Sequence, residues 1–286
     1  MSKPQINKID SMNFFQKIVF FLIAFVPFAL SAQTSVDLDS EFGGRISVGI
    51  DKKIQKGLHV SLNEELRLDD NFKSVNRLQT NIGVDYKLMQ RIKLGVGYSL
   101  LNPYDMTEKV FSDAKHRIVF SATGIVRYGQ WRFALKEQFQ LTHRTGSFNE
   151  YQNPRNALTL KSRLSAKYNY SERFAPYVFV EFRSVLNAPV VVASYDGTNY
   201  LTSSGSKIGD AGWFLDGFSG NYLNRIRLGV GAQIKFDVHN GLNICLLLDR
   251  VSDKIVDANA EGTKLKSYTK ETGFVGQIGV GYVYSF

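Results

Sequence analysis

Charged side chains spaced two residues apart are the feature of this 286-residue sequence that is best able to do chemistry. Glu65 stands two residues before Arg67, and Glu181 two residues before Arg183. On an extended strand this spacing places both side chains on one face. Such a ladder could form ion pairs that fill and stiffen an interior, or line a cation-rich passage that favours anions. The complete set of candidates is Glu65, Arg67, Arg77, Arg117, Arg163, Glu181, Arg183, Arg225 and Arg227.

Catalytic chemistry has much weaker support in the sequence. A lipid hydrolase at a membrane surface needs a serine activated by a histidine. His143, with Ser147 in the segment that follows it, is the one pair that suits this role. Cys245 is the single cysteine, so no disulfide is expected. We predict no catalytic residue, no metal site and no cofactor.

The elements that position the charged ladder are β-strands. From Ile92 to Leu100, apolar residues at even positions alternate with Lys93, Gly95, Gly97 and Ser99. An alternation with a period of two indicates a strand with one apolar and one polar face. The same pattern recurs at residues 58–68, 78–88, 118–128, 131–141, 158–168, 178–182, 226–236 and 274–286.

The connections between these strands alternate in length. Short turns are predicted near 55–57, 89–90, 129–130, 171–173 and 239–240, and long polar loops near 102–115, 143–156, 187–221 and 252–271. Short turns at one end and long loops at the other are typical of an outer-membrane β-barrel. Eleven strands are clear from Arg45 onward. A weaker segment at Gln33–Phe42, followed by a tight hairpin at Gly43–Gly44, would make twelve.

The fold prediction is therefore all-β: a closed antiparallel transmembrane β-barrel of about twelve strands, with ten as the alternative and both ends of the mature chain in the periplasm. A soluble β-sandwich or lipocalin-like barrel is the competing fold. Aromatic residues favour the membrane barrel, because they gather near the short turns and the C-terminus as an interfacial girdle does. The girdle residues are Tyr86, Tyr128, Trp131, Tyr168, Tyr170, Phe174, Phe236, Tyr284 and Phe286.

The N-terminus has the pattern of a secretory signal peptide. Lys3, Lys8 and Lys17 flank an uncharged stretch from Ile18 to Ala32 that ends in small residues. We assign 1–32 to the signal peptide and 33–286 to the barrel, because fifteen uncharged residues are short for a membrane anchor. The formal net charge is +9, but an exported protein is not expected to bind nucleic acid. The mean hydropathy of −0.16 excludes a helical membrane protein.

Two parts of the chain resemble known proteins. Tyr282, Tyr284 and Phe286 form an ending that resembles the terminal strand of outer-membrane barrels, and this resemblance implies recognition by their assembly machinery. The middle of the chain resembles an uncharacterised family, domain of unknown function 2490. That resemblance implies an outer-membrane barrel and supplies no activity, substrate or catalytic residue. Its motifs are Glu64–Arg67, Arg77, His116–Arg117, Arg163, Glu181–Arg183 and Asn224–Arg227.

Three functions follow as hypotheses for a protein of the Gram-negative outer membrane. The first is a small channel or transport barrel whose basic lumen passes anionic or polar solutes. The second is a structural or ligand-binding barrel with a plugged lumen, whose long loops meet external ligands. The third is a lipid-modifying enzyme that uses His143. The expected partners are outer-membrane lipid, the assembly machinery during biogenesis, and a solute or external ligand that the sequence does not identify.

Overall fold

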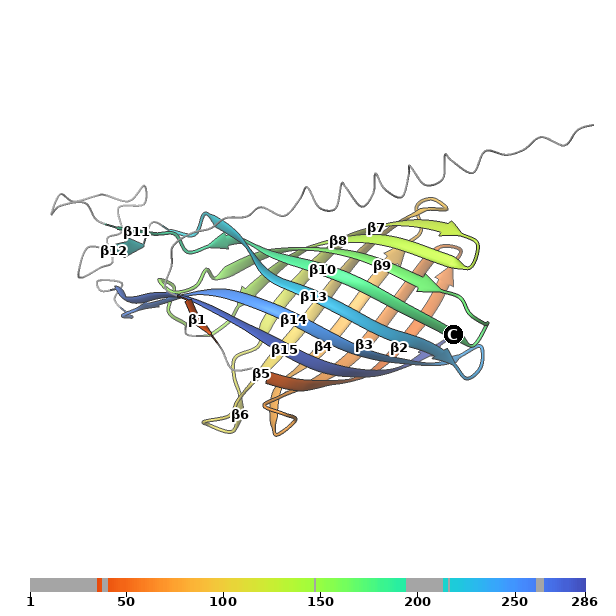
Figure 1. Cartoon of the computed structure of the whole chain (residues 1–286), viewed down its shortest axis with the longest axis horizontal. Coiled ribbons are helices and arrows are strands. Elements are labelled where there is room, and N and C mark those ends of the chain that lie inside the picture. The colour runs from red at the N-terminus through yellow and green to blue at the C-terminus, as the bar shows by residue number, and fades with distance from the viewer. Residues whose placement is uncertain (1–34, 38–40, 147, 194–212, 216, 261–264) are drawn as a thin grey trace, which may run out of the picture. The chain divides into compact units, whose positions relative to one another are not determined.

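Eleven long strands form the wall of a closed β-barrel within the described part of this computed structural model (Figure 1). Each pairs antiparallel with the next one along the chain, and β15 pairs with β2 to close the wall. The all-β closed-barrel prediction is confirmed. The wall strands are β2 (Glu41–Gln55), β3 (Leu58–Asp69), β4 (Ser74–Tyr86), β5 (Ile92–Asp105), β7 (Lys115–Tyr128), β8 (Trp131–Arg144), β9 (Asn156–Tyr168), β10 (Phe174–Ala188), β13 (Gly220–Lys235), β14 (Asn240–Ala258) and β15 (Leu265–Ser285).

The structure describes residues 35–37, 41–146, 148–193, 213–215, 217–260 and 265–286. The predicted signal peptide at 1–32 and Ser147 lie outside these ranges, as does much of the segment between β11 and β12. Ser35–Phe286 form one compact unit. No helix among the described residues is both long and apolar enough to cross a membrane.

The closing pair of strands is parallel, which the sequence did not predict. Glu41 pairs with Val275 and Asp51 with Ser285, so β2 and β15 run in the same direction. This follows from the strand number, because alternating directions around an odd number of strands bring two parallel strands together. In place of a twelfth wall strand, β1 (Ser35–Asp37) pairs with β15 near its start. The described chain therefore begins at the long-loop end and finishes at the short-turn end, and the prediction of a shared periplasmic side is wrong for these residues.

The hairpin predicted at Gly43–Gly44 does not form, because both glycines lie inside β2. Their role is to let another segment approach. A Cβ at Gly44 would lie 2.6 Å from Phe72, in the four-residue turn between β3 and β4. Phe72 also packs edge-to-face on Phe42, with ring centroids 5.5 Å apart, and the Asn71 amide donates to the Phe42 carbonyl at 2.8 Å. Gly44 is thus a packing surface for this turn, whereas a Cβ at Gly43 would collide with the Leu68 carbonyl oxygen of β3.

The barrel places apolar side chains outside and polar ones inside. Val96 on β5 is 54% exposed, and apolar residues at alternate positions of the other strands are similarly exposed. Glu181 and Asp249 are only 1% and 2% exposed. Alternate strand positions face opposite sides of the sheet, so this inversion means that the polar face lines the lumen. A water-soluble barrel would have the opposite arrangement.

The connections at the long-loop end contain additional short strands. β6 (Val110–Phe111) pairs with β5, and β11 (Val191–Ala193) pairs with β12 (Trp213–Leu215). The segment 252–271, predicted as a loop, is mostly a continuation of the wall strands, since β14 reaches Ala258 and β15 starts at Leu265. Polar residues occupy both faces of this segment, so the alternation of apolar and polar residues fades there, which is why its strand character was missed.

Candidate functional site

The nine predicted charged residues occupy inward-facing positions on six of the wall strands. They lie between five and eleven residues from the short-turn ends of their strands, which is about 13–28 Å along the barrel axis at the usual rise and tilt, so they gather around the middle of the lumen. They therefore form one layer across the lumen. We call it the arginine layer: Glu65, Arg67, Arg77, Arg117, Arg163, Glu181, Arg183, Arg225 and Arg227, joined by Arg45 and Asp249.

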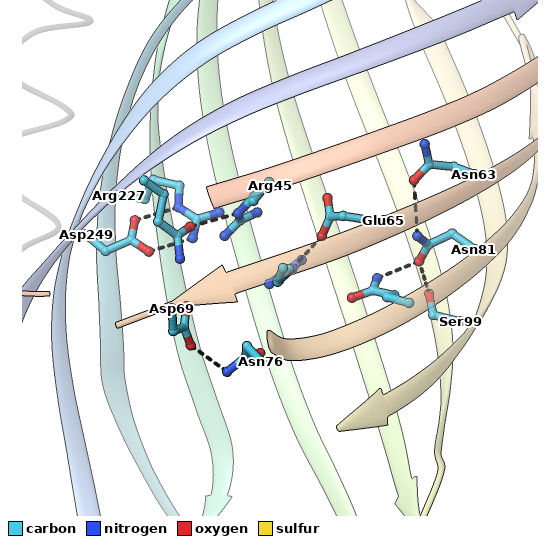
Figure 2. A network of polar contacts seen from close by, with 12 residues as sticks. Arg45, Asn63, Glu65, Asp69, Asn76, Asn81, Ser99, Arg227 and Asp249 are labelled. Carbon is cyan, nitrogen blue, oxygen red and sulfur yellow. Dashed lines mark hydrogen bonds and ion pairs between the residues drawn. The ribbon is translucent and has the colours of Figure 1, made fainter. Parts of the chain in front are cut away.

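One side of the arginine layer is an ion-pair network across β9, β10, β13 and β14. Glu181 accepts hydrogen bonds from Arg163 Nε at 2.8 Å and Nη2 at 2.5 Å, and lies 4.0 Å from Arg227 Nη1. Arg227 in turn donates from Nε and Nη2 to both carboxylate oxygens of Asp249, at 2.6 and 2.5 Å (Figure 2). Arg225 Nη1 lies 3.6 Å from Asp249. Bidentate geometry and burial make this network the stiffest part of the layer.

Among the described residues, the other side of the layer has one carboxylate in an ion pair, Glu65. Arg67 pairs with Glu65 on the same strand, as the spacing of two predicted. Arg45 donates to Gln277 Oε1 at 2.8 Å, and Arg117 donates to Thr142 Oγ1 at 2.9 Å, so both use neutral partners. Most of the layer's positive charge is therefore uncompensated on this side.

Three arginines of the layer have a buried Nε without a hydrogen-bond partner: Arg77, Arg183 and Arg225. Arg225 still lies close to Asp249 through its Nη1. Arg77 interacts electrostatically with Arg67, Arg117 and Arg45, and Arg117 interacts with Arg183. β4 and β10 lie on opposite sides of the barrel in the strand order, and Arg117 on β7, between them, interacts with the arginines of both strands.

A cavity of about 250 Å³ lies beside the layer. Its lining includes Arg45, Arg163 and Arg227 on the charged side, and Gly279 and Gly281 on β15. Inward-facing glycines continue around the wall toward the short-turn end, at Gly83, Gly95, Gly97 and Gly231. On the short-turn side of the layer the lumen therefore combines these glycines with longer inward side chains, among them the Lys93–Asp85 ion pair at 2.9 Å.

Two aromatic residues of β10 project over glycines on β13. A Cβ at Gly229 would collide with the Phe179 ring, and one at Gly231 would lie 2.7 Å from the Tyr177 hydroxyl. The Arg163 guanidinium sits 4.2 Å from the centre of the Phe179 ring, and Tyr177 donates to Asn243 Oδ1 at 3.0 Å. The glycines make room for the rings, and the Phe179 ring in turn holds Arg163 in place.

A neutral polar ladder lies on the opposite wall, on β3, β4 and β5. Ser99 donates to Asn81 Oδ1 at 2.7 Å, Gln79 Nε2 donates to the same oxygen at 2.6 Å, and Asn81 donates to Asn63 at 3.4 Å (Figure 2). These bonds satisfy one another along the wall. The side chains of this ladder are polar and uncharged.

Sequence reasoning missed two members of the layer. Asp249 lies on the inward face of β14 and is the main partner of Arg227. The alternation of Ile244, Leu246 and Leu248 with Asn243 and Cys245 would have placed Asp249 inward. Arg45 begins the first clear strand, and only the barrel closure brings it beside Gln277, far along the sequence.

The predicted lipase pair is only partly described. His143 is the second-last residue of β8, and its Nδ1 lies 2.8 Å from Asn156 Oδ1. Ser147, its proposed nucleophile, lies outside the described residues. Another histidine, His59, contacts Asp51 at 3.1 Å near the short-turn end of the lumen. Within the described part of the chain, no three His, Cys, Asp or Glu residues gather as a metal site.

The C-terminal residues form an aromatic group at the short-turn end. Tyr284 stacks on His239 with ring centroids 5.8 Å apart, and Phe286 packs edge-to-face on Tyr284 at 4.8 Å. Tyr282 donates its hydroxyl proton to Asn240. The Phe286 amide donates to the Asp51 carbonyl at 2.9 Å, which fixes the last residue to the neighbouring strand.

Comparison with known proteins gives one family. Residues 46–209, more than half of the chain, match the family described as "Protein of unknown function (DUF2490)". No curated protein matches the sequence significantly. The matched range begins in β2 and covers the wall as far as β10, so it includes the predicted residues from Glu65 to Arg183.

Proposed function

This chain belongs to the DUF2490 family of proteins of unknown function, and from the geometry of its lumen we propose that it is a small outer-membrane channel whose basic constriction favours anionic solutes. The observation that carries the proposal is the charge of the arginine layer. Seven further arginines join Arg45 and Lys161 on inward positions, and among the described residues four carboxylates lie near them: Glu65, Glu181, Asp249 and Asp253.

The dimensions of the barrel support a narrow passage. Eleven strands at about 4.8 Å spacing and about 40° tilt give a backbone radius of about 11 Å. An arginine side chain extends over more than half of that radius, whereas glycine adds nothing to the wall. We therefore assign the constriction to the arginine layer, and the inward glycines leave more space beside it.

The exterior supports the outer-membrane location. Exposed apolar residues cover the strands, as in Val96 and Leu246, and such a surface suits lipid better than water. Trp131 and Tyr168 pack against each other at the short-turn end, with centroids 4.9 Å apart. Aromatic residues at that position match the interfacial girdle of membrane barrels.

The test is single-channel conductance of the refolded protein in a planar bilayer, with ion selectivity measured from reversal potentials in a salt gradient. We expect a small steady conductance that prefers anions. Arg117→Glu should reduce this preference, because Arg117 lies in the constriction. Arg250→Glu is the matched control, since Arg250 lies on the outward face of β14 and is exposed. A folded protein that does not conduct, or equal selectivity in both variants, would refute the channel.

A specific observation supports the second hypothesis, a barrel whose loops bind an external ligand. Connections at the long-loop end are packed together: Asn149 donates to the Ala258 carbonyl at 2.7 Å, and Gln152 donates to Asp257 at 2.9 Å. Leu215 from β12 joins Val256 and Ala258 in a small apolar cluster. A non-conducting barrel with these loops intact would favour this role. We propose no enzymatic activity for the protein.

A further inference from the structure

We propose that Arg77, Arg117 and Arg183 form a binding site for phosphate or the phosphate group of a soluble ester. We call these three residues the anion cluster. The inference deepens the proposed function by naming the class of solute, and it rests on that function for the route by which the anion arrives. Binding itself does not require that the barrel conducts.

The first argument is the unequal distribution of carboxylates. Glu181 and Asp249 hold three arginines in the ion-pair network and are themselves almost fully buried. The anion cluster receives none of these contacts: Arg117 uses Thr142, and the buried Nε atoms of Arg77 and Arg183 have no hydrogen-bond partner. Arg183 interacts electrostatically with Asp253 and Glu181, and Arg77 with Glu65, but each carboxylate has other partners. Asp253 Oδ1 accepts from Tyr222 and Asn224, Glu181 accepts from Arg163, and Glu65 pairs with Arg67. The cluster therefore retains unused donors and unbalanced charge.

The second argument is convergence. Arg77 lies on β4, Arg117 on β7 and Arg183 on β10, so the three come from separate parts of the wall. Arg117 nevertheless interacts electrostatically with both of the others. Like charges that are held together with buried unsatisfied donors are unfavourable without a counter-ion. An anion between them would accept the unused hydrogen bonds and balance the charge.

The third argument identifies the anion. Guanidinium groups offer paired N–H donors in a planar fork that matches two oxygens of one phosphate. Three arginines from different directions require an acceptor with oxygens on several sides. Tetrahedral phosphate has this form, whereas a carboxylate offers two coplanar oxygens and chloride is a single point of charge. The cluster is thus expected to select phosphate over chloride.

The test is isothermal titration of the refolded full barrel in detergent with inorganic phosphate, with chloride replacing phosphate to hold the ionic strength constant. We expect saturable binding to the wild type. Arg77→Gln and Arg183→Gln should each weaken it about tenfold or more, since each loses a charged hydrogen-bond donor. Arg132→Gln is the matched control: Arg132 also faces inward with a buried unpartnered Nε, but lies near the short-turn end of β8. Its affinity for phosphate should equal that of the wild type.

Three results would overturn the inference: no saturable binding to the folded wild type, equal binding of phosphate and chloride, or an equal loss of affinity in Arg132→Gln. Heat-modifiable migration on gels establishes that each variant is folded before titration. Conductance of the same samples separates this inference from the channel. Saturable binding without conductance supports the site and refutes the channel, whereas conductance with no phosphate binding supports the channel and refutes the site.

Discussion

Neutralising Glu181 should lower stability and raise anion preference at the same time. Glu181→Gln keeps the shape of the side chain but removes the charge that Arg163 and Arg227 share. The two guanidinium groups would then face each other across a neutral amide. One substitution is thus expected to lower the stability of the barrel and to raise its anion selectivity. A variant that merely fails to fold would lose stability without gaining selectivity.

The size of the stability loss follows from the contacts. Glu181 accepts two charged hydrogen bonds from Arg163, each worth about 1.5–3 kcal/mol. Removing one partner of a buried ion pair costs about 3–5 kcal/mol. The Arg163 side chain is 39% exposed, so water compensates part of this loss. We expect the free energy of unfolding to fall by about 2–4 kcal/mol.

The assay is urea unfolding of the refolded barrel in lipid vesicles, followed by tryptophan fluorescence. A double-mutant cycle with Arg163→Gln completes the test, because the double variant no longer contains the uncompensated arginine. Its stability should exceed that of Glu181→Gln alone. Our reasoning is wrong if the free energy of unfolding of Glu181→Gln lies within about 0.5 kcal/mol of the wild-type value. It is also wrong if adding Arg163→Gln lowers the free energy of unfolding by as much again.

Three other features give predictions. Gly44→Val should destabilise the barrel by about 1–3 kcal/mol through collision with Phe72, and Phe72→Ala in the same chain should recover part of that loss, which urea unfolding measures. Val96→Arg should cost about 2–4 kcal/mol in vesicles if β5 faces lipid there, whereas the inward Thr123→Arg should cost much less; equal costs would contradict the membrane orientation. Deletion of Phe286 should reduce the amount of heat-modifiable barrel in cell membranes without reducing synthesis, and an unchanged amount would exclude its role as an assembly signal.

The period of two was enough to predict the wall strands, because burial on a barrel reverses at every residue. It also assigned the charged ladder to one face, and the Glu65–Arg67 pair follows from spacing on one strand. The pairing of Arg227 with Asp249 did not follow. It depends on the register between β13 and β14, which the sequence pattern does not determine.

The strand count and the role of Gly43–Gly44 were harder to predict for a related reason. A glycine pair after a weak strand indicates a hairpin on local grounds. Here both glycines lie inside β2, and Gly44 provides space for Phe72, which lies in the turn between β3 and β4. Packing between residues distant in sequence therefore outweighs the local hairpin pattern. Without a hairpin at Gly43–Gly44 the wall has eleven strands and not twelve.

The parallel seam between β2 and β15 has a consequence for how the protein assembles. Every other neighbouring pair in the wall is joined directly through a turn or loop, but this one unites the two ends of the sheet that are most distant along the chain. Closing so long a loop carries the largest entropy cost, and parallel pairing returns slightly less stability per residue. The seam should therefore form last, and its precursor would be a curved open sheet with two unsatisfied edges. Such edges invite pairing with other chains, so protection during biogenesis is needed most at β2 and β15.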